Sequence, residues 1–265
     1  MTTIFQDTRY WNPEYLNYST VRSAITYDRY GGMMMNPYKA LTKWVKDKSD
    51  AMIIGSIVDE HFTEWINFYE TYKAVSRRSG DDETELTNSM YTAIDTIIQS
   101  MNEVPYMEDI SFVDYSARFV QQLTLEDNEL QIKGKLDFYD EEVNKIIDLK
   151  CTGSIDTFLK DMYDYKLINL SPLHPYVRQL AWYSYLVEKN YGSYPQAELL
   201  AVSHKWEPIR IKVPEDVRHK AFDILLTDIA LLRSTIASGD FSFVTRPAER
   251  TTEEQSTTIN VLDLI

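Results

Sequence analysis

Two aspartates and a lysine stand where their side chains could bind a metal ion. Asp148 and Lys150 interrupt the run IIDLKC, whose other members are typical of a buried strand, and Asp137 lies in the preceding segment. A charged group in apolar surroundings costs several kcal/mol, as an order of magnitude, unless it is paired or bound to a metal. Two carboxylates suit Mg²⁺ or Mn²⁺, hard cations that also accept phosphate oxygens.

This chemistry would suit the hydrolysis of a phosphate ester. A metal held by Asp137 and Asp148 could lower the pKa of a bound water and stabilise charge on a phosphoryl group. Lys150, two residues beyond one ligand, could hold or activate the attacking water and stabilise the developing charge. The alternative is a surface hairpin with a charged outer face, since a D…DxK pattern is common on its own.

Two predicted strands, 130–139 and 145–151, must position these groups. Side chains alternate across a strand, so each strand has an apolar face and a face that carries the charged residues. If both apolar sets face one core, Asp137, Asp148 and Lys150 share the opposite face, and diagonal neighbours in a hairpin lie roughly 7–8 Å apart. The apolar sets are Leu130, Ile132, Leu136 and Phe138 in the first strand and Ile147, Leu149 and Cys151 in the second.

Two predicted helices add polar side chains. Gln179 and Tyr183 are four residues apart and share one face of a helix over 175–190, although an amphipathic helix whose polar tips reach water explains them equally. Asp59 and His61 follow Gly55 in an upstream helix. Two residues span about 200° of a helix, so these two cannot both face one site, and either could be an exposed position.

The remaining pattern indicates an α/β (α+β) fold with an antiparallel meander at its centre. Apolar periodicity and breakers predict helices over 37–48, 52–75, 86–101, 175–190 and 214–236. Alternation predicts strands over 118–125, 130–139, 145–151, 198–203 and 209–213. We expect one domain over 1–245, with parts 1–115 (mainly helical), 116–213 (sheet and the helix of Gln179) and 214–238 (C-terminal helix), and a flexible acidic and polar tail over 246–265.

Composition limits the classes of function. The chain has 265 residues, 44% hydrophobic and 26% charged, which suits a folded soluble protein. No apolar stretch approaches the roughly 20 residues that span a membrane, and no signal peptide is evident, so we expect a cytoplasmic protein. The net charge of −14 speaks against simple attraction to nucleic acid, but residues 131–190 hold 8 basic against 9 acidic residues. A local groove for nucleic acid therefore stays possible.

The order of these motifs resembles a known superfamily. G55-x-x-x-D59, G134-x-x-D137, D148-x-K150 and Q179-x-x-x-Y183 follow one another as in the PD-(D/E)xK nucleases. The chain is most similar to the RecB-like and phage-exonuclease branch, which includes the nuclease domain of RecE and lambda-type exonucleases. The resemblance spans roughly residues 50–215 and implies a restriction-endonuclease-like core, with a central mixed sheet flanked by helices and a helical N-terminal region.

The resemblance also implies metal ligands. Asp137 and Asp148 match the metal-binding carboxylates, the main-chain carbonyl of Leu149 joins them, and Mg²⁺ is the expected ion, with Mn²⁺ able to substitute. The family's helical ligand, usually a histidine four residues after the glycine, falls on Asp59. We favour Asp59 as the ligand over His61, because its spacing fits and an oxygen donor suits Mg²⁺.

The other site residues follow from the same resemblance. Lys150 matches the catalytic lysine, and Gln179 and Tyr183 match the helix motif that positions the catalytic site and binds the DNA end. Some RecB-like nucleases carry a cysteine-bound iron–sulfur cluster. Cys151 is the only cysteine, which excludes such a cluster here.

The leading hypothesis is an Mg²⁺-dependent exonuclease that degrades linear double-stranded DNA in phage-type recombination or end resection, inside a phage-infected or prophage-bearing bacterial cell. By analogy we expect a homo-oligomer and a single-strand annealing protein as partner, docked on the tail that ends at Ile265. Alternatives are an endonuclease or single-strand nuclease with the same core, and an acidic DNA mimic that inhibits a host factor. A mimic has no need of Lys150 among metal ligands.

Overall fold

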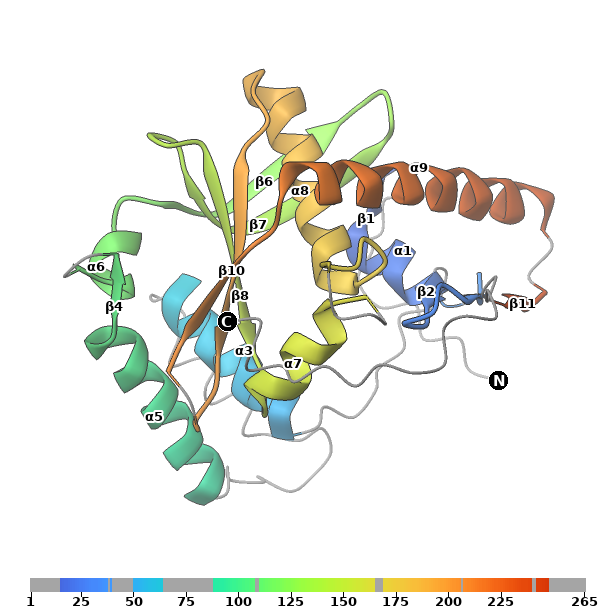
Figure 1. The fold of residues 1–265 in the computed structure, drawn as a ribbon. Helices are drawn as coiled ribbons and strands as arrows, with labels where there is room; N and C mark the ends of the chain where they lie inside the picture. Colours follow the sequence, from blue (N-terminus) through green and yellow to red (C-terminus); the bar gives the residue numbers. More distant parts are fainter. Residues whose placement is uncertain are drawn as a thin grey trace, which may run out of the picture.

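The described part of the chain is a central mixed sheet with helices on both faces (Figure 1). The structure is a computed structural model that describes residues 15–37, 39, 50–63, 88–107, 110–164, 169–205, 207–239 and 242–247. Its helices are α1 (Tyr18–Ala24), α3 (Asp50–Thr63), α5 (Asn88–Glu103), α6 (Phe112–Ser116), α7 (Ile155–Met162), α8 (Pro175–Tyr191) and α9 (Glu215–Ser238). Its strands are β1 (Leu16–Asn17), β2 (Ile25–Tyr27), β3 (Met33–Met35), β4 (Pro105–Met107), β5 (Ile110–Ser111), β6 (Val120–Asp127), β7 (Ile132–Asp140), β8 (Lys145–Cys151), β9 (Gln196–Val202), β10 (Ile209–Lys212) and β11 (Val244–Arg246).

The six-stranded central sheet combines a meander with a helical crossover. Its order is β1-β7-β8-β9-β10, with β6 also paired to β7. β6, β7 and β8 pair antiparallel as the sequence predicts, and so do β9 and β10. β8 and β9 run parallel, because α7 and α8 connect them across the sheet. This arrangement confirms the predicted restriction-endonuclease-like core.

Helices bury both faces of this sheet. α1, α8 and α9 cover one face, and their apolar residues form a first cluster with Ile132, Leu136 and Ile146. α3, α5 and α6 cover the other face, where a second cluster contains Phe138, Ile147 and Leu149. Figure 1 shows α8 and α9 on the opposite side of the strands from α3 and α5. The core is therefore two layers separated by the sheet.

The prediction that the apolar residues of β7 share one core is wrong. Leu136 packs in the first cluster and Phe138 in the second, although alternation puts them on the same face. The change occurs at Asp137, the position opposite Gln122, whose φ of +54° is unusual for a strand residue. Asp148 consequently does not lie on an open face but is buried between packed layers, whereas Lys135 of β7 is exposed.

The predicted helices agree with the structure where it describes them. The helix expected over 52–75 begins at Asp50, and its residues 64–75 lie outside the described residues, as do most of 37–48 and the tail from 248 onward. α5 begins and ends two residues later than expected. α8 ends as expected, with Gly192 at φ +80° in the left-handed region that favours glycine.

Two short elements, α7 and β1, correspond to no predicted element. α7 is capped by Ser154, which accepts a hydrogen bond from Thr157 N at 3.3 Å. Ile155, Phe158 and Leu159, spaced as on a helix face, pack into the first cluster and were the available signal. β1 pairs in parallel with the first residues of β7, a contact over more than 100 residues that no local pattern indicates.

A buried ion pair joins the two long helices. Arg178 of α8 and Asp228 of α9 form a side-chain ion pair, and their residues are 2% and 1% exposed. Tyr27 of β2 donates its hydroxyl to Asp228 Oδ1 at 2.7 Å. Burial raises the pKa of the Asp228 carboxyl, while Arg178 and the Tyr27 hydrogen bond act against that rise. The pair thus links α8, α9 and the small β2–β3–β11 sheet.

Among the described residues, no helix is both long enough and apolar enough to cross a membrane.

Candidate active site

Asp137 and Asp148 lie where β7 and β8 stop pairing. The last paired residues at this end are Phe138 and Ile147, and the two aspartates occupy the next position on each strand. Asp137 Oδ2 accepts a hydrogen bond from the main-chain N–H of Leu149 at 3.1 Å. The two aspartates therefore lie beside each other just beyond the last paired residues, where the β7–β8 ladder has ended.

The side chain of Asp148 is fully buried, and Lys150 pairs with it. Its exposed fraction is 0%, and its Oδ2 forms an ion pair with Lys150 Nζ. Its Oδ1 has no hydrogen-bond partner. Lys150 Nζ also donates to the main-chain oxygen of Leu149 at 3.3 Å. The ammonium group consequently engages two oxygens that the sequence analysis assigned to a metal ion.

The electrostatics of the site follow from this crowding. Burial and the neighbouring Asp148 carboxylate raise the pKa of Asp137 well above its usual range, although Lys150 acts in the other direction. Burial disfavours the ammonium form of Lys150, but Asp148 and Asp137 outweigh it and raise the lysine's pKa. Lys150 is therefore positively charged at neutral pH, which suits charge stabilisation and hydrogen-bond donation better than abstraction of a proton.

Helix α8 brings Gln179 and Tyr183 to the same place. Its first turn is capped by His174, whose Nδ1 accepts a hydrogen bond from Tyr176 N at 3.2 Å, and Pro175 occupies the first helical position. Gln179 Nε2 donates to the Tyr183 hydroxyl at 2.9 Å. Tyr183 is 7% exposed, so it is buried, whereas an amphipathic surface helix would extend this side chain into water. Burial, with the two aspartates next in effect, raises the tyrosine's pKa.

Gly134 permits the close contact between β7 and α8. A Cβ atom at this position would lie 2.8 Å from Leu186 Cδ1 and 3.1 Å from the ring of Tyr183. We expect Gly134→Ala to lower the free energy of unfolding by about 1–3 kcal/mol, because an overpacked contact forces side chains or backbone to move. Urea denaturation measures this change. Gly153→Ala is the matched control, since a Cβ there meets nothing within 4 Å and should cost much less.

Helix α3 carries Asp59, whose charge acts on Asp137. The helix packs on β8 at Gly55, where an added Cβ would lie 3.5 Å from the Cβ of Cys151. Asp59 raises the pKa of Asp137 electrostatically, and it also contributes, after burial, to raising the pKa of Cys151 to about 12. The pKa of His61 is lowered by burial, with no contribution from a carboxylate.

The donor atoms of this site fit a hard divalent cation. The buried Oδ1 of Asp148 lacks a hydrogen bond, and such an oxygen is costly unless a donor or cation satisfies it. Asp137, whose pKa is raised by the adjacent carboxylate, would ionise readily beside added positive charge. Among the described residues, no three side chains of His, Cys, Asp or Glu form a metal-binding group. The chain therefore offers two carboxylates and the Leu149 carbonyl, leaving positions for water and substrate, as is usual for Mg²⁺.

Two aromatic residues and an arginine near this site were not singled out by the sequence analysis. Lys150 Nζ lies 5.2 Å from the ring centre of Tyr176, and the guanidinium of Arg22 lies 5.4 Å from the same ring. Tyr18 of α1 donates its hydroxyl to the Pro175 carbonyl. Arg22 and Tyr18 precede Asp137 by more than 100 residues, so no spacing could indicate their place beside it.

Comparisons with known proteins agree with this fold. A family model described as "PDDEXK-like domain of unknown function (DUF3799)" matches residues 37–230. A crystal structure described as "Putative exonuclease", from Eubacterium rectale, aligns with a TM-score of 0.68 at 19% identity, over 99% of this chain and 98% of the other. No curated protein matches the chain. At this identity the crystal structure supports the fold, and the family match covers the segment that contains Asp59, Asp137, Asp148, Lys150, Gln179 and Tyr183.

Proposed function

Because the chain belongs to the PDDEXK-like domain family DUF3799, and hence to the PD-(D/E)xK nuclease superfamily, we propose that it is an Mg²⁺-dependent exonuclease of linear double-stranded DNA. The observation that carries this proposal is the buried Asp148–Lys150 pair beside Asp137, at the end of the β7–β8 ladder. A stable core alone would gain little from a buried carboxylate with an unsatisfied oxygen. A site for a metal ion and a phosphate explains it.

The roles of the residues follow from their positions. Asp137, Asp148 and the Leu149 carbonyl would hold the metal ion, with Asp59 adding negative charge nearby. When bound, the ion supplies a Lewis acid for the phosphoryl oxygens and lowers the pKa of a bound water. With a metal ion on the Asp148 and Leu149 oxygens, the Lys150 ammonium, which engages both of them, would be able to donate hydrogen bonds to the attacking water or to a phosphate oxygen. Gln179 holds Tyr183 by a hydrogen bond, and the pair positions the DNA end.

A degradation assay tests the activity. The substrate is a linear duplex labelled at one end, with 5′-phosphate or 5′-hydroxyl termini, incubated with Mg²⁺, with Mn²⁺, or with EDTA. We expect progressive loss from the ends with either metal and none with EDTA. Absence of degradation under all metal conditions, together with no Mn²⁺ binding by calorimetry, would contradict the proposal and favour an acidic DNA mimic.

An endonuclease or single-strand nuclease with the same core is the second enzyme hypothesis. Covalently closed circular duplex separates it from an exonuclease, because a circle has no end to enter. We expect the circle to survive amounts of enzyme that degrade the linear form completely. Cleavage of the circular and linear duplexes at equal rates would assign endonuclease activity. If a single-stranded substrate is cleaved and neither duplex is, the protein is a single-strand nuclease.

Assembly is part of the same proposal and rests on the resemblance to ring-forming phage exonucleases. We propose a homo-oligomer that passes single strands to an annealing protein in a bacterial cell that carries a phage or prophage. Light scattering gives the mass of the particle in solution, and a monomer at micromolar concentration would contradict it. The tail over 246–265, mostly outside the described residues, is the proposed docking segment, so its deletion should abolish binding of the partner.

A further inference from the structure

Three groups of the described chain lie around the ammonium of Lys150. It forms an ion pair with Asp148 Oδ2 and donates a hydrogen bond to the main-chain oxygen of Leu149 at 3.3 Å. Its Nζ also lies 5.2 Å from the ring centre of Tyr176, a half-buried residue in the first turn of α8. The two oxygens are the proposed ligands of a metal ion. Of these three groups, the aromatic ring is therefore the one that would still contact the lysine when the metal ion is bound.

An aromatic ring can hold a cation without occupying its hydrogen-bond donors. The face of a tyrosine ring carries partial negative charge and attracts an ammonium group within about 6 Å of its centre. Because this attraction is not a directed hydrogen bond, the N–H groups of Lys150 stay free to bind an attacking water or a phosphate oxygen. A carboxylate in the same place would accept those hydrogen bonds itself.

Contacts from three helices fix the position of the Tyr176 ring. Phe158 of α7 stacks on it, with ring centres 5.6 Å apart and an angle of 24° between the ring planes. His174, the N-cap of α8, packs against it at 5.2 Å and accepts a hydrogen bond from its main-chain N–H. Tyr18 of α1 donates its hydroxyl to the carbonyl of Pro175, the preceding residue. The ring is thus held in place by residues that do not belong to the metal site.

A second cation lies beside the same ring. The guanidinium of Arg22, an exposed residue of α1, is 5.4 Å from the ring centre of Tyr176. Its charge acts on this part of the site, because Arg22 contributes, after burial, to lowering the pKa of His174 to about 4. A movement of Lys150 toward Arg22 would bring two positive charges together. The ring and Arg22 therefore both favour a position of Lys150 close to the aspartates.

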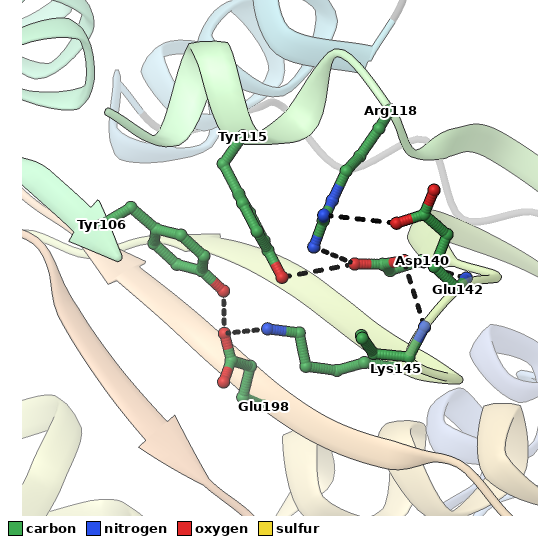
Figure 2. Close-up of polar contacts among 8 residues, drawn as sticks. Tyr106, Tyr115, Arg118, Asp140, Glu142, Lys145 and Glu198 are labelled. Carbon is green, nitrogen blue, oxygen red and sulfur yellow. Dashed lines mark hydrogen bonds and ion pairs between the residues drawn. The ribbon is translucent and has the colours of Figure 1, made fainter. Parts of the chain in front are cut away.

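The other lysine of β8 has similar neighbours in a place where no metal ion is proposed. Lys145 Nζ lies 3.7 Å from Glu198 Oε1 and 5.5 and 5.1 Å from the ring centres of Tyr106 and Tyr115. Figure 2 shows this ammonium pointing toward Glu198, with both rings close by. A tyrosine beside a lysine is consequently not by itself a sign of catalysis, and this second cluster provides a matched control.

We propose that Tyr176 is a positioning residue, whose ring keeps the Lys150 ammonium beside the attacking water or the phosphate oxygen when a metal ion occupies the Asp148 and Leu149 oxygens. This inference rests on the proposed nuclease function and adds a residue to its site. Tyr176 acts through Lys150 and needs no contact of its own with DNA. The role requires the ring and not the hydroxyl, so phenylalanine should serve in its place.

Initial rates on linear duplex with Mg²⁺ test this role in the full chain. We expect Tyr176→Leu to lower kcat by about 10- to 100-fold, because a small displacement of a catalytic group has an effect of this order. KM and the affinity for Mn²⁺ should stay unchanged, since the substitution alters neither the metal ligands nor the contacts to DNA. Tyr176→Phe should keep the wild-type kcat. A purely structural role would reduce the folded fraction and leave kcat per folded molecule unchanged.

Tyr115→Leu is the matched control, because it removes a ring from the other lysine of β8. We expect both leucine variants to unfold at lower urea concentration than the wild type, and only Tyr176→Leu to lose kcat. The proposal is overturned if folded Tyr176→Leu has the kcat of an active wild type, or if the two leucine variants lose kcat equally.

A spectroscopic measurement separates this inference from the proposed function. The ring current of Tyr176 should shift the NMR signal of the Lys150 ε-methylene group upfield, and Lys150→Met assigns the signal by removing it. We expect the upfield shift to persist in the wild type at saturation with Mg²⁺, followed by calorimetry, and to be absent from Tyr176→Leu.

The outcomes of this measurement differ for the two hypotheses. A signal that moves to the position of an exposed lysine on saturation with Mg²⁺ would overturn the positioning role, whatever the activity. A retained shift in a wild type that binds Mg²⁺ but degrades no DNA would support the contact and contradict the nuclease function. A wild type that binds no Mg²⁺ would overturn both.

Discussion

Asp148→Asn is expected to reduce the rate of DNA degradation by about 10³-fold or more while the chain stays folded. The substitution keeps the shape of the buried side chain and removes the negative charge that the proposed metal ion needs. A metal ion contributes several kcal/mol to transition-state stabilisation, and each 1.4 kcal/mol corresponds to a factor of ten in rate. Initial rates on end-labelled linear duplex measure the loss, and circular dichroism confirms folding. Asp156→Asn, an exposed acid at the start of α7, is the control and should keep full activity.

Lys150→Met separates the role of the lysine from that of the ligands. The ammonium group engages Asp148 and the Leu149 carbonyl, so its removal frees these oxygens. We therefore expect Lys150→Met to lose activity to a similar extent but to bind Mn²⁺ at least as tightly as the wild type. Asp148→Asn should lose both. Degradation that survives both substitutions would refute the assignment of the site.

Arg178→Met is expected to cause a large loss of stability. Removing one partner of a buried ion pair leaves an uncompensated charge, which costs about 3–5 kcal/mol. Asp228 would keep only the hydrogen bond from Tyr27, in surroundings that already raise its pKa. For a chain of this size, the melting temperature should fall by about 6–20 °C.

The dependence on pH and a double variant identify the cause. Without Arg178, the pKa of Asp228 in the folded state rises further above the 3.8 of an exposed aspartate. A buried carboxyl with a raised pKa destabilises the fold once the pH is high enough for the group to ionise. The loss of stability caused by Arg178→Met should therefore grow as the pH rises from acid toward neutral. Arg178→Met with Asp228→Leu should recover most of the stability. A single variant as stable as the wild type at pH 7 would show that the pair contributes nothing.

Local patterns predicted the elements of this fold better than their packing. Alternation in 145–151 located β8 with its correct ends, and Gly192 marked the end of α8. Alternation could not show that both faces of the sheet are covered, because the sequence of a strand does not indicate which helices pack against it. Alternation therefore predicts that Leu136 and Phe138 lie on the same face, whereas in the structure they pack in two different clusters.

The candidate site shows the same limit. Gly134, Asp137 and Asp148 could be found because their spacing follows the strands that carry them. The choice between Asp59 and His61 depends on which side of helix α3 faces β8, and the spacing of residues along the sequence does not fix that orientation. Arg22 and Tyr18 carry no motif at all. Their significance comes from long-range contacts, which fix a side chain's surroundings without leaving a local pattern.

Because β8 divides two dissimilar cores, the length of the turn before it is strictly constrained. Residues 141–144 connect β7 to β8, and Ile146 and Ile147 pack into different clusters. A single inserted or deleted residue in that turn would exchange the faces of every side chain on β8. Asp148 and Lys150 would then enter the apolar layer under α3 and α5, and Leu149 would take their place. Homologous chains should thus vary in the identity of these turn residues and hardly ever in their number.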